Sequence, residues 1–265
     1  MFKTYTFKRL LTLTIIVGLL LFQPLTVAAL TSSEAKQEWY NAKEASRDAQ
    51  ETHRKANIQW AANKTDENNK KVIDTGKDAL QAALDEAESW LIWRDLEVKE
   101  NPEIPADLKQ RIQQDVETNL DKIDELRAEV DGIENRLQLA IVFIKMVGKY
   151  IELVADVARN TGLIWVHLTN TYIEALDNYE AQLREASENL GNDELTAKLD
   201  KAAEELASAR TNIDQAETEY NEVVIPGNPI LKFMNGNQHL RIAKNHMLTA
   251  HSNLKQAYRL LVETG

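Results

Sequence analysis

The sequence contains no cysteine, and it contains only 5 prolines and 9 glycines among 265 residues. Without cysteine the chain has no disulfide framework, no thiol nucleophile, no cysteine ligand for zinc and no lipid-modified cysteine. Residues that break helices are few, whereas Ala, Leu, Glu, Lys and Gln are abundant. This composition favours long α-helices that stay folded by packing alone.

Motifs that would indicate catalysis or metal binding are also missing. The sequence has no Gly-rich phosphate loop, no EF-hand loop and no Gly-x-Ser-x-Gly turn. Its five histidines form no His-Glu-x-x-His motif, and none follows a Glu by three residues as in di-iron bundles. These histidines are His53, His167, His239, His246 and His251. We therefore expect no enzyme activity, no metal and no cofactor, although a haem or another small molecule between helices stays open as an alternative.

The charge is acidic, with 31 Lys and Arg against 42 Asp and Glu and a net charge of −11. Residues 1–29 contain three basic and no acidic side chains, so their removal would take the net charge to −14. Such a chain repels phosphate backbones, which argues against a nucleic-acid partner and makes anionic lipid a less favourable one.

The N-terminus has the three parts of a secretory signal peptide. Lys3, Lys8 and Arg9 precede a mostly apolar stretch at 10–22, and Val27 and Ala29 are the small residues at positions −3 and −1 of a cleavage site. This pattern predicts a signal peptide over 1–29, cleavage after Ala29 and an extracytoplasmic protein that is periplasmic, secreted or at the cell surface. An uncleaved N-terminal anchor is the alternative, although 13 residues fall short of the ~20 that span a bilayer.

The centre of the chain carries one long heptad-like seam. Stepping alternately by four and three residues from Leu126 to Leu190 meets an apolar side chain everywhere except at Gly162 and Thr169. Asn160 and Gly162 are typical of helix ends, yet the phase of the seam is unchanged beyond them. The sequence therefore predicts a single helix over 106–190, roughly 125 Å long at 1.5 Å per residue.

Shorter helices are predicted on both sides of this long one, over 31–63, 66–98, 193–223 and 237–263. Thr31 and Glu34 are spaced as a capping box, and Gly191–Asn192 reads as a stop followed by a new start. The seam slips at 63–69, where a turn is slightly favoured over one continuous helix. Asn63 is also the acceptor of a possible N-glycosylation sequon.

These elements predict an all-α fold, an elongated antiparallel helical bundle or coiled coil built on one long central helix. In one layout a helical hairpin or pair packs at each end of that helix. In the other, 31–98 is a single helix, and a four-helix bundle carries a two-helix stalk.

The most apolar part after residue 30 is 139–144, followed by the charged stripe Lys145, Lys149, Glu152 and Asp156. The stripe indicates a central helix whose neighbours cover every other face, so we expect 137–168 to be core. A membrane-active helix, resembling those of pore-forming toxins, is the alternative.

The connection before the last helix is too apolar for a loop that serves only to link two helices. We expect its side chains to plug one end of the bundle, and the alternative is an exposed tip that binds a partner. These candidate residues are Ile225, Ile230, Leu231, Phe233 and Met234.

Together, these features predict an exported, non-enzymatic helical scaffold or adaptor. It would act by binding another protein or by self-association, and membrane contact is a weaker expectation.

Overall fold

The computed structural model describes residues 30–188 and 190–264, and this part of the chain consists of helices and the turns between them. The predicted signal peptide and its cleavage site after Ala29 lie outside the described residues. The helices are α2 (Ser32–Ala62), α3 (Asp66–Glu100), α4 (Ala106–Asp131), α5 (Arg136–Ser187), α6 (Asp193–Asn221) and α7 (Pro229–Thr264).

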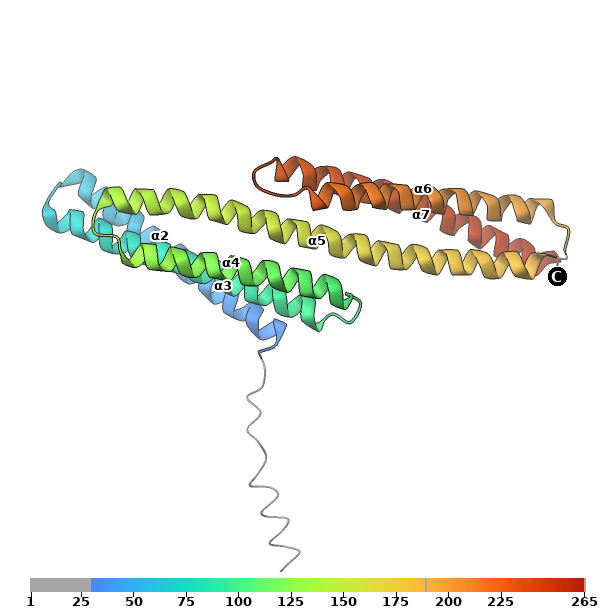
Figure 1. Cartoon of the computed structure of the whole chain (residues 1–265), viewed down its shortest axis with the longest axis horizontal. Helices are drawn as coiled ribbons and strands as arrows, with labels where there is room; N and C mark the ends of the chain where they lie inside the picture. Colours follow the sequence, from blue (N-terminus) through green and yellow to red (C-terminus); the bar gives the residue numbers. More distant parts are fainter. Residues whose placement is uncertain (1–29, 189, 265) are drawn as a thin grey trace, which may run out of the picture.

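The long helix α5 runs through the whole molecule, as Figure 1 shows. The helices α2, α3 and α4 lie beside its first half, and the antiparallel pair α6 and α7 lies beside its second half. Each half has its own cluster of buried apolar side chains. The all-α fold with a long central helix is thus confirmed, in the layout that packs helices at each end.

The predicted single helix over 106–190 is wrong, because it is divided at 132–135 into α4 and α5. Gly132 caps α4, and Asn135 opens α5 by accepting a hydrogen bond from the backbone N–H of Gln138 at 3.0 Å. Ile133, inside the turn, is buried in the same core as Val130. The apolar phase therefore survives the turn, which is why the seam concealed it.

By contrast, α5 continues without a break through Asn160 and Gly162. A Cβ at Gly162 would overlap the ring of Tyr220, and one at Gly236 would lie 2.6 Å from its Cε1 atom. Glycine at both positions makes room for the buried Tyr220, whose hydroxyl donates to Asn237 Oδ1 at 2.8 Å. Gly162 therefore serves close packing rather than helix termination.

The α6–α7 pair is held by small residues at heptad spacing. Three alanines on each helix are fully buried, which lets the two backbones approach closely. They are Ala202, Ala209, Ala216, Ala243, Ala250 and Ala257. On α5 the buried side chains of this half include Val166 and Ile173, whereas Trp165 and Tyr172 of the predicted seam are exposed at its margin.

The predicted start of the last helix at 237 is also wrong, because α7 begins at Pro229. Asn228 accepts a hydrogen bond from the backbone N–H of Leu231 at 3.1 Å, and proline suits the first helical position. At the other end of the chain, the favoured turn at 63–69 is present. The helix α2 ends at Ala62, Thr65 caps α3, and the indole rings of Trp39 and Trp93 stack at 4.9 Å.

Candidate functional site

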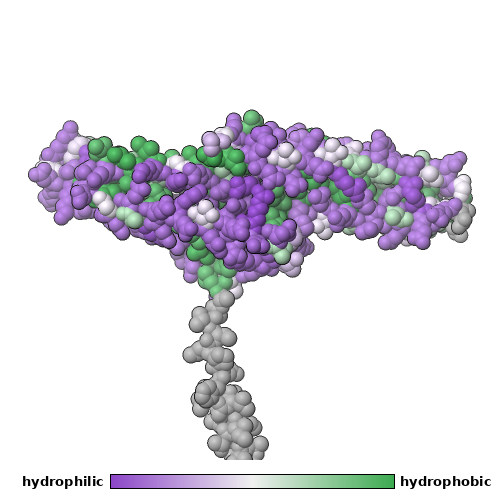
Figure 2. All heavy atoms as spheres, viewed as in Figure 1, coloured by the Kyte–Doolittle hydropathy of each residue, from purple (hydrophilic) through white to green (hydrophobic). Residues whose placement is uncertain are grey.

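The first half of α5 carries a broad row of apolar side chains that no helix of the described chain covers. We call this row the α5 face, and its members are between 39% and 71% exposed. They are Leu137, Ile141, Phe143, Ile144, Val147, Tyr150, Ile151 and Val154. In Figure 2 hydrophobic side chains gather along the upper edge of the molecule over this region and beside the tip of the α6–α7 pair.

The orientation of α5 explains this exposure. Lys145 contacts Glu129 at 2.7 Å, Glu152 contacts Lys122 at 3.2 Å, and Asp156 accepts from Asn119 at 3.0 Å, all on α4. The charged stripe therefore faces α4. The prediction that 137–168 is core is wrong for the outward side of 137–154, because the stripe lies along α4 and the apolar side facing away from α4 meets no helix of the described chain there. The stripe is only partly removed from solvent, since the side chain of Lys145 remains 54% exposed.

A buried polar cluster fixes this orientation near the middle of the molecule. Arg159 donates to Asp115 at 2.8 Å and contacts Asp156 at 2.9 Å, and Asn160 donates to Asp115 at 3.0 Å. The side chains of Arg159 and Asn160 are buried. Buried charges that are paired in this way resist rotation of one helix against the other, because any slip would leave a charge without its partner.

Two hollows lie at the ends of the α5 face. The first, of about 480 Å³, lies among α2, α3 and α5 and is lined by His53, Gly76 and Phe143 among others. The second is an almost wholly apolar groove of about 410 Å³ between α5 and the start of α7. Its walls include Ile151 and Ile230. The face therefore has a hollow at each end, and a smaller hollow of about 270 Å³, lined mostly by charged side chains of α4 and α5, borders its middle at Gly148.

The predicted loop residues divide between the two roles considered for them. Phe233 is half-buried, and its ring lies 5.7 Å from that of Tyr220 and 6.3 Å from that of Trp165. The other four, Ile225, Ile230, Leu231 and Met234, are exposed, with Ile230 at 74% and Met234 at 61%. Phe233 closes the end of the core, while its neighbours on α7 extend the apolar surface beside the α5 face.

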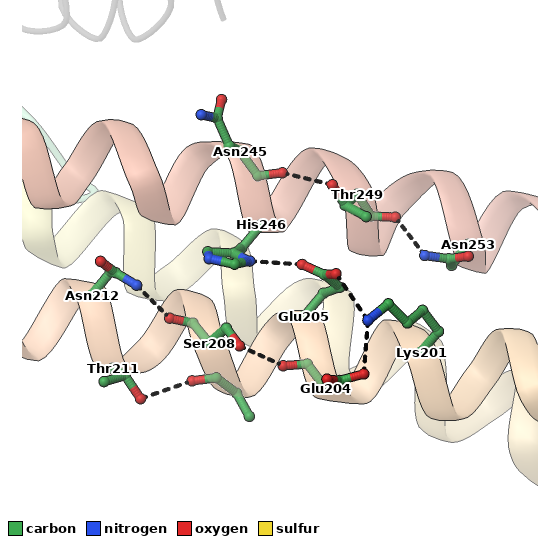
Figure 3. Close-up of polar contacts among 11 residues, drawn as sticks. Lys201, Glu204, Glu205, Ser208, Thr211, Asn212, Asn245, His246, Thr249 and Asn253 are labelled. Carbon is green, nitrogen blue, oxygen red and sulfur yellow. Dashed lines mark hydrogen bonds and ion pairs between the residues drawn. The ribbon is translucent and has the colours of Figure 1, made fainter.

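The histidines are placed separately along the molecule. His53 lies at 3.2 Å from the Thr75 hydroxyl, and burial lowers its pKa. His167 contacts the carbonyl oxygen of Glu103 at 2.9 Å. His246 on α7 contacts Glu205 on α6 at 2.6 Å, as Figure 3 shows. Within residues 30–188 and 190–264, no three His, Asp or Glu side chains lie together as a metal site requires.

Two further findings concern the surface. Asn63 lies in the exposed turn between α2 and α3, where an attached glycan would meet solvent. None of the described helices is both long enough and apolar enough to cross a membrane.

The sequence held a signal for the exposed face that its simple seam did not capture. Apolar residues between 137 and 154 occupy more than the two positions per heptad that one partner helix needs. A second apolar side of α5, with Leu139, Val142 and Leu153, packs against α3 and α4. The apolar surface of this stretch is therefore wider than the chain's own helices cover.

No protein-family model matches the sequence, and comparisons with curated proteins and with solved structures found no match either. The function is therefore inferred from the chain itself.

Proposed function

We propose that the chain is an exported, non-enzymatic helical scaffold that binds another protein chain through the α5 face. The observation that carries the proposal is the exposure of eight neighbouring apolar side chains on one rigid helix. Exposed apolar patches beyond about 300–600 Å² on a soluble protein mark interaction sites. Export rests on the signal-like pattern of residues 1–29.

The geometry of the face favours a helical partner. Leu137, Ile141, Ile144, Gly148 and Ile151 follow the four–three spacing by which helices pack along a seam. A partner helix lying along this strip would bury side chains that already stand in regular rows, and little of the backbone of α5 would need to rearrange.

A binding experiment with matched variants tests the proposal. Tagged chain is incubated with an envelope or secreted fraction of the native host, comparing wild type with Ile144→Asp and Leu248→Asp. Both replaced side chains are exposed, at 69% and 58%, but Leu248 lies on α7 outside the α5 face. We expect Ile144→Asp alone to lose the captured protein. Equal capture by all three chains would contradict the proposal.

Membrane activity is the second candidate, and the same exposed apolar face favours it. An apolar helical surface can lie in the interface of a bilayer with its side chains among the acyl chains. Flotation with neutral and with anionic vesicles separates the two proposals. Vesicle binding by wild type that is lost in Ile144→Asp and kept in Leu248→Asp would identify lipid, rather than protein, as the partner.

A further inference from the structure

The centre of the α5 face has a similar pattern when it is followed from either end, although Phe143 and Tyr150 correspond to the charged residues Glu152 and Lys145. Counting outward from the midpoint between Val147 and Gly148, Ile144 corresponds to Ile151 and Ile141 to Val154. A second α5 running in the opposite direction would therefore place these four aliphatic side chains in pairs opposite each other.

The midpoint of the face permits close approach. A Cβ added at Gly148 would meet no atom within 4 Å, so the space above this glycine is open. A residue without a side chain at the crossing point of two helices lets their backbones come near each other.

The area of the face suits a stable pair. At 39–71% exposure, its eight side chains present on the order of 800 Å², which is about what each partner contributes to an interface of standard size. The exposed side chains of Ile230 and Met234 on α7 enlarge this surface at one end.

The charged side chains of α5 that border the face are paired within the chain, even though the whole chain is acidic. The eight members of the face are all uncharged, and Lys145 and Glu152 on the same stretch of α5 pair with α4 instead. In the antiparallel register Lys145 and Glu152 of one copy would lie opposite Tyr150 and Phe143 of the other, so like charges would not face each other directly. Charged side chains of α4 and α5 nevertheless border the crossing point, because Gly148 also lines a hollow with Glu125 and Glu129.

The hollows also correspond. In an antiparallel pair, the α5 residues of the first hollow, 136–143, lie opposite 152–159 of the other copy, which include Val154, Ala155 and Ala158 of the second hollow. The apolar tip of α7, with Ile230 at 74% exposure, would then lie against the depression beside Phe143.

We propose that a second copy of this chain covers the α5 face, antiparallel to the first and related to it by a two-fold axis near Val147 and Gly148. This inference rests on the proposed function, since it names the partner of the same face. In such a pair the exposed apolar side chains of both copies would lie in one isologous interface, which is the arrangement usual in homodimers.

Single cysteines test the geometry, because the chain has none of its own. Val147 lies beside the axis, so Val147→Cys is expected to form disulfide-linked dimers under mild oxidation. The two copies of residue 137 would lie about 31 Å apart along the helices, so Leu137→Cys is expected to remain monomeric. Equal cross-linking at both positions would indicate parallel chains, and absence of cross-linking at Val147→Cys would overturn the inference.

Sedimentation of the full chain supplies the second measurement. Ile144→Asp is expected to weaken dimerisation by about 100-fold or more, since each copy would bring a carboxylate into an apolar interface, whereas Leu248→Asp leaves it unchanged. If the wild type is monomeric and its capture of another protein still depends on Ile144, the inference of a second copy is overturned and the proposed function stands. Monomers that bind vesicles through Ile144 would overturn the proposed function as well.

Discussion

The two halves of α5 carry the same apolar repeat and meet different surroundings. From Leu137 the four–three spacing runs through Ile141, Ile144, Gly148 and Ile151, and it continues through Ala155 to Gly162. Where α6 and α7 pack against the helix, Ala155 and Gly162 of this repeat are buried, whereas its positions from Leu137 to Ile151 are exposed. The same pattern thus gives core beside the α6–α7 pair and surface before that pair is reached.

The lengths of the helices account for this difference. With 52 residues α5 is about 78 Å long, whereas α6 has 29 residues and spans about 44 Å. The α6–α7 pair turns back at the groove beside Tyr150, so its side of α5 has no neighbour before that point. A repeat therefore defines which side of a helix can accept a partner, while the chain length of the neighbours decides how far that side is covered.

The largest expected effect on stability is the difference between truncating a buried leucine and truncating an exposed isoleucine of α5. We expect Leu176→Ala, in the second half, to lower the free energy of unfolding by about 2–5 kcal/mol, because it leaves a cavity in the core of α5, α6 and α7. Ile144→Ala, in the first half, should change it by no more than about 0.5 kcal/mol.

Urea denaturation of the two variants measures both values, at protein concentrations low enough to keep the chain monomeric. A loss of 2 kcal/mol or more in monomeric Ile144→Ala would show that the α5 face is covered within the chain, and the contrast between the halves would then fail.

Two glycines of α5 should respond to alanine substitution with stability changes of opposite sign. At Gly162 an added methyl group would overlap the ring of Tyr220, so Gly162→Ala should cost about 1–3 kcal/mol of stability. At Gly148 the added group meets open space, so Gly148→Ala should stabilise the monomer by about 0.5–1 kcal/mol through its better helix propensity.

Thermal or urea unfolding of the two variants tests this reversal of sign. In a Tyr220→Leu background the smaller side chain should remove most of the cost of Gly162→Ala. If the cost persists there, the overlap with the Tyr220 ring is not its cause.

Much of the fold followed from local rules. The capping box at Thr31, the turn after Ala62 and the restart at Asn192 were all predicted from short signals that do not depend on distant neighbours. The continuity of α5 through Gly162 was predicted as well, although the reason for a glycine at this position, the ring of Tyr220, lies 58 residues away in the sequence.

The errors arose where tertiary contacts reused or hid a local signal. Gly132 and Asn135 are ordinary stop and start residues, but the burial of Ile133 in the turn preserved the apolar phase across it. The face to which Lys145 belongs was assigned to solvent, because periodicity gives the angle between side chains and not the identity of their neighbours. The acidic helix α4, with Glu129, supplies that neighbour.

The smallest effect concerns a polar contact within the covered half, where Glu205 on α6 lies 2.6 Å from His246 on α7 (Figure 3). The hydrogen bond with His246, assisted by Lys201, holds the pKa of Glu205 below its ordinary value of 4.5. A lowered carboxyl pKa stabilises the folded chain above pH 4.5, and this contribution is lost as the pH falls through the folded-state pKa. We therefore expect Glu205→Gln to lower the free energy of unfolding by about 1 kcal/mol or less near pH 6 and to approach the wild type in acid.

Urea denaturation across this pH range measures the effect, and Glu217→Gln, an exposed change on the same helix, is the matched control. A deficit of Glu205→Gln that stays constant into acid would assign the effect to packing of this side chain rather than to its ionised pairing with His246.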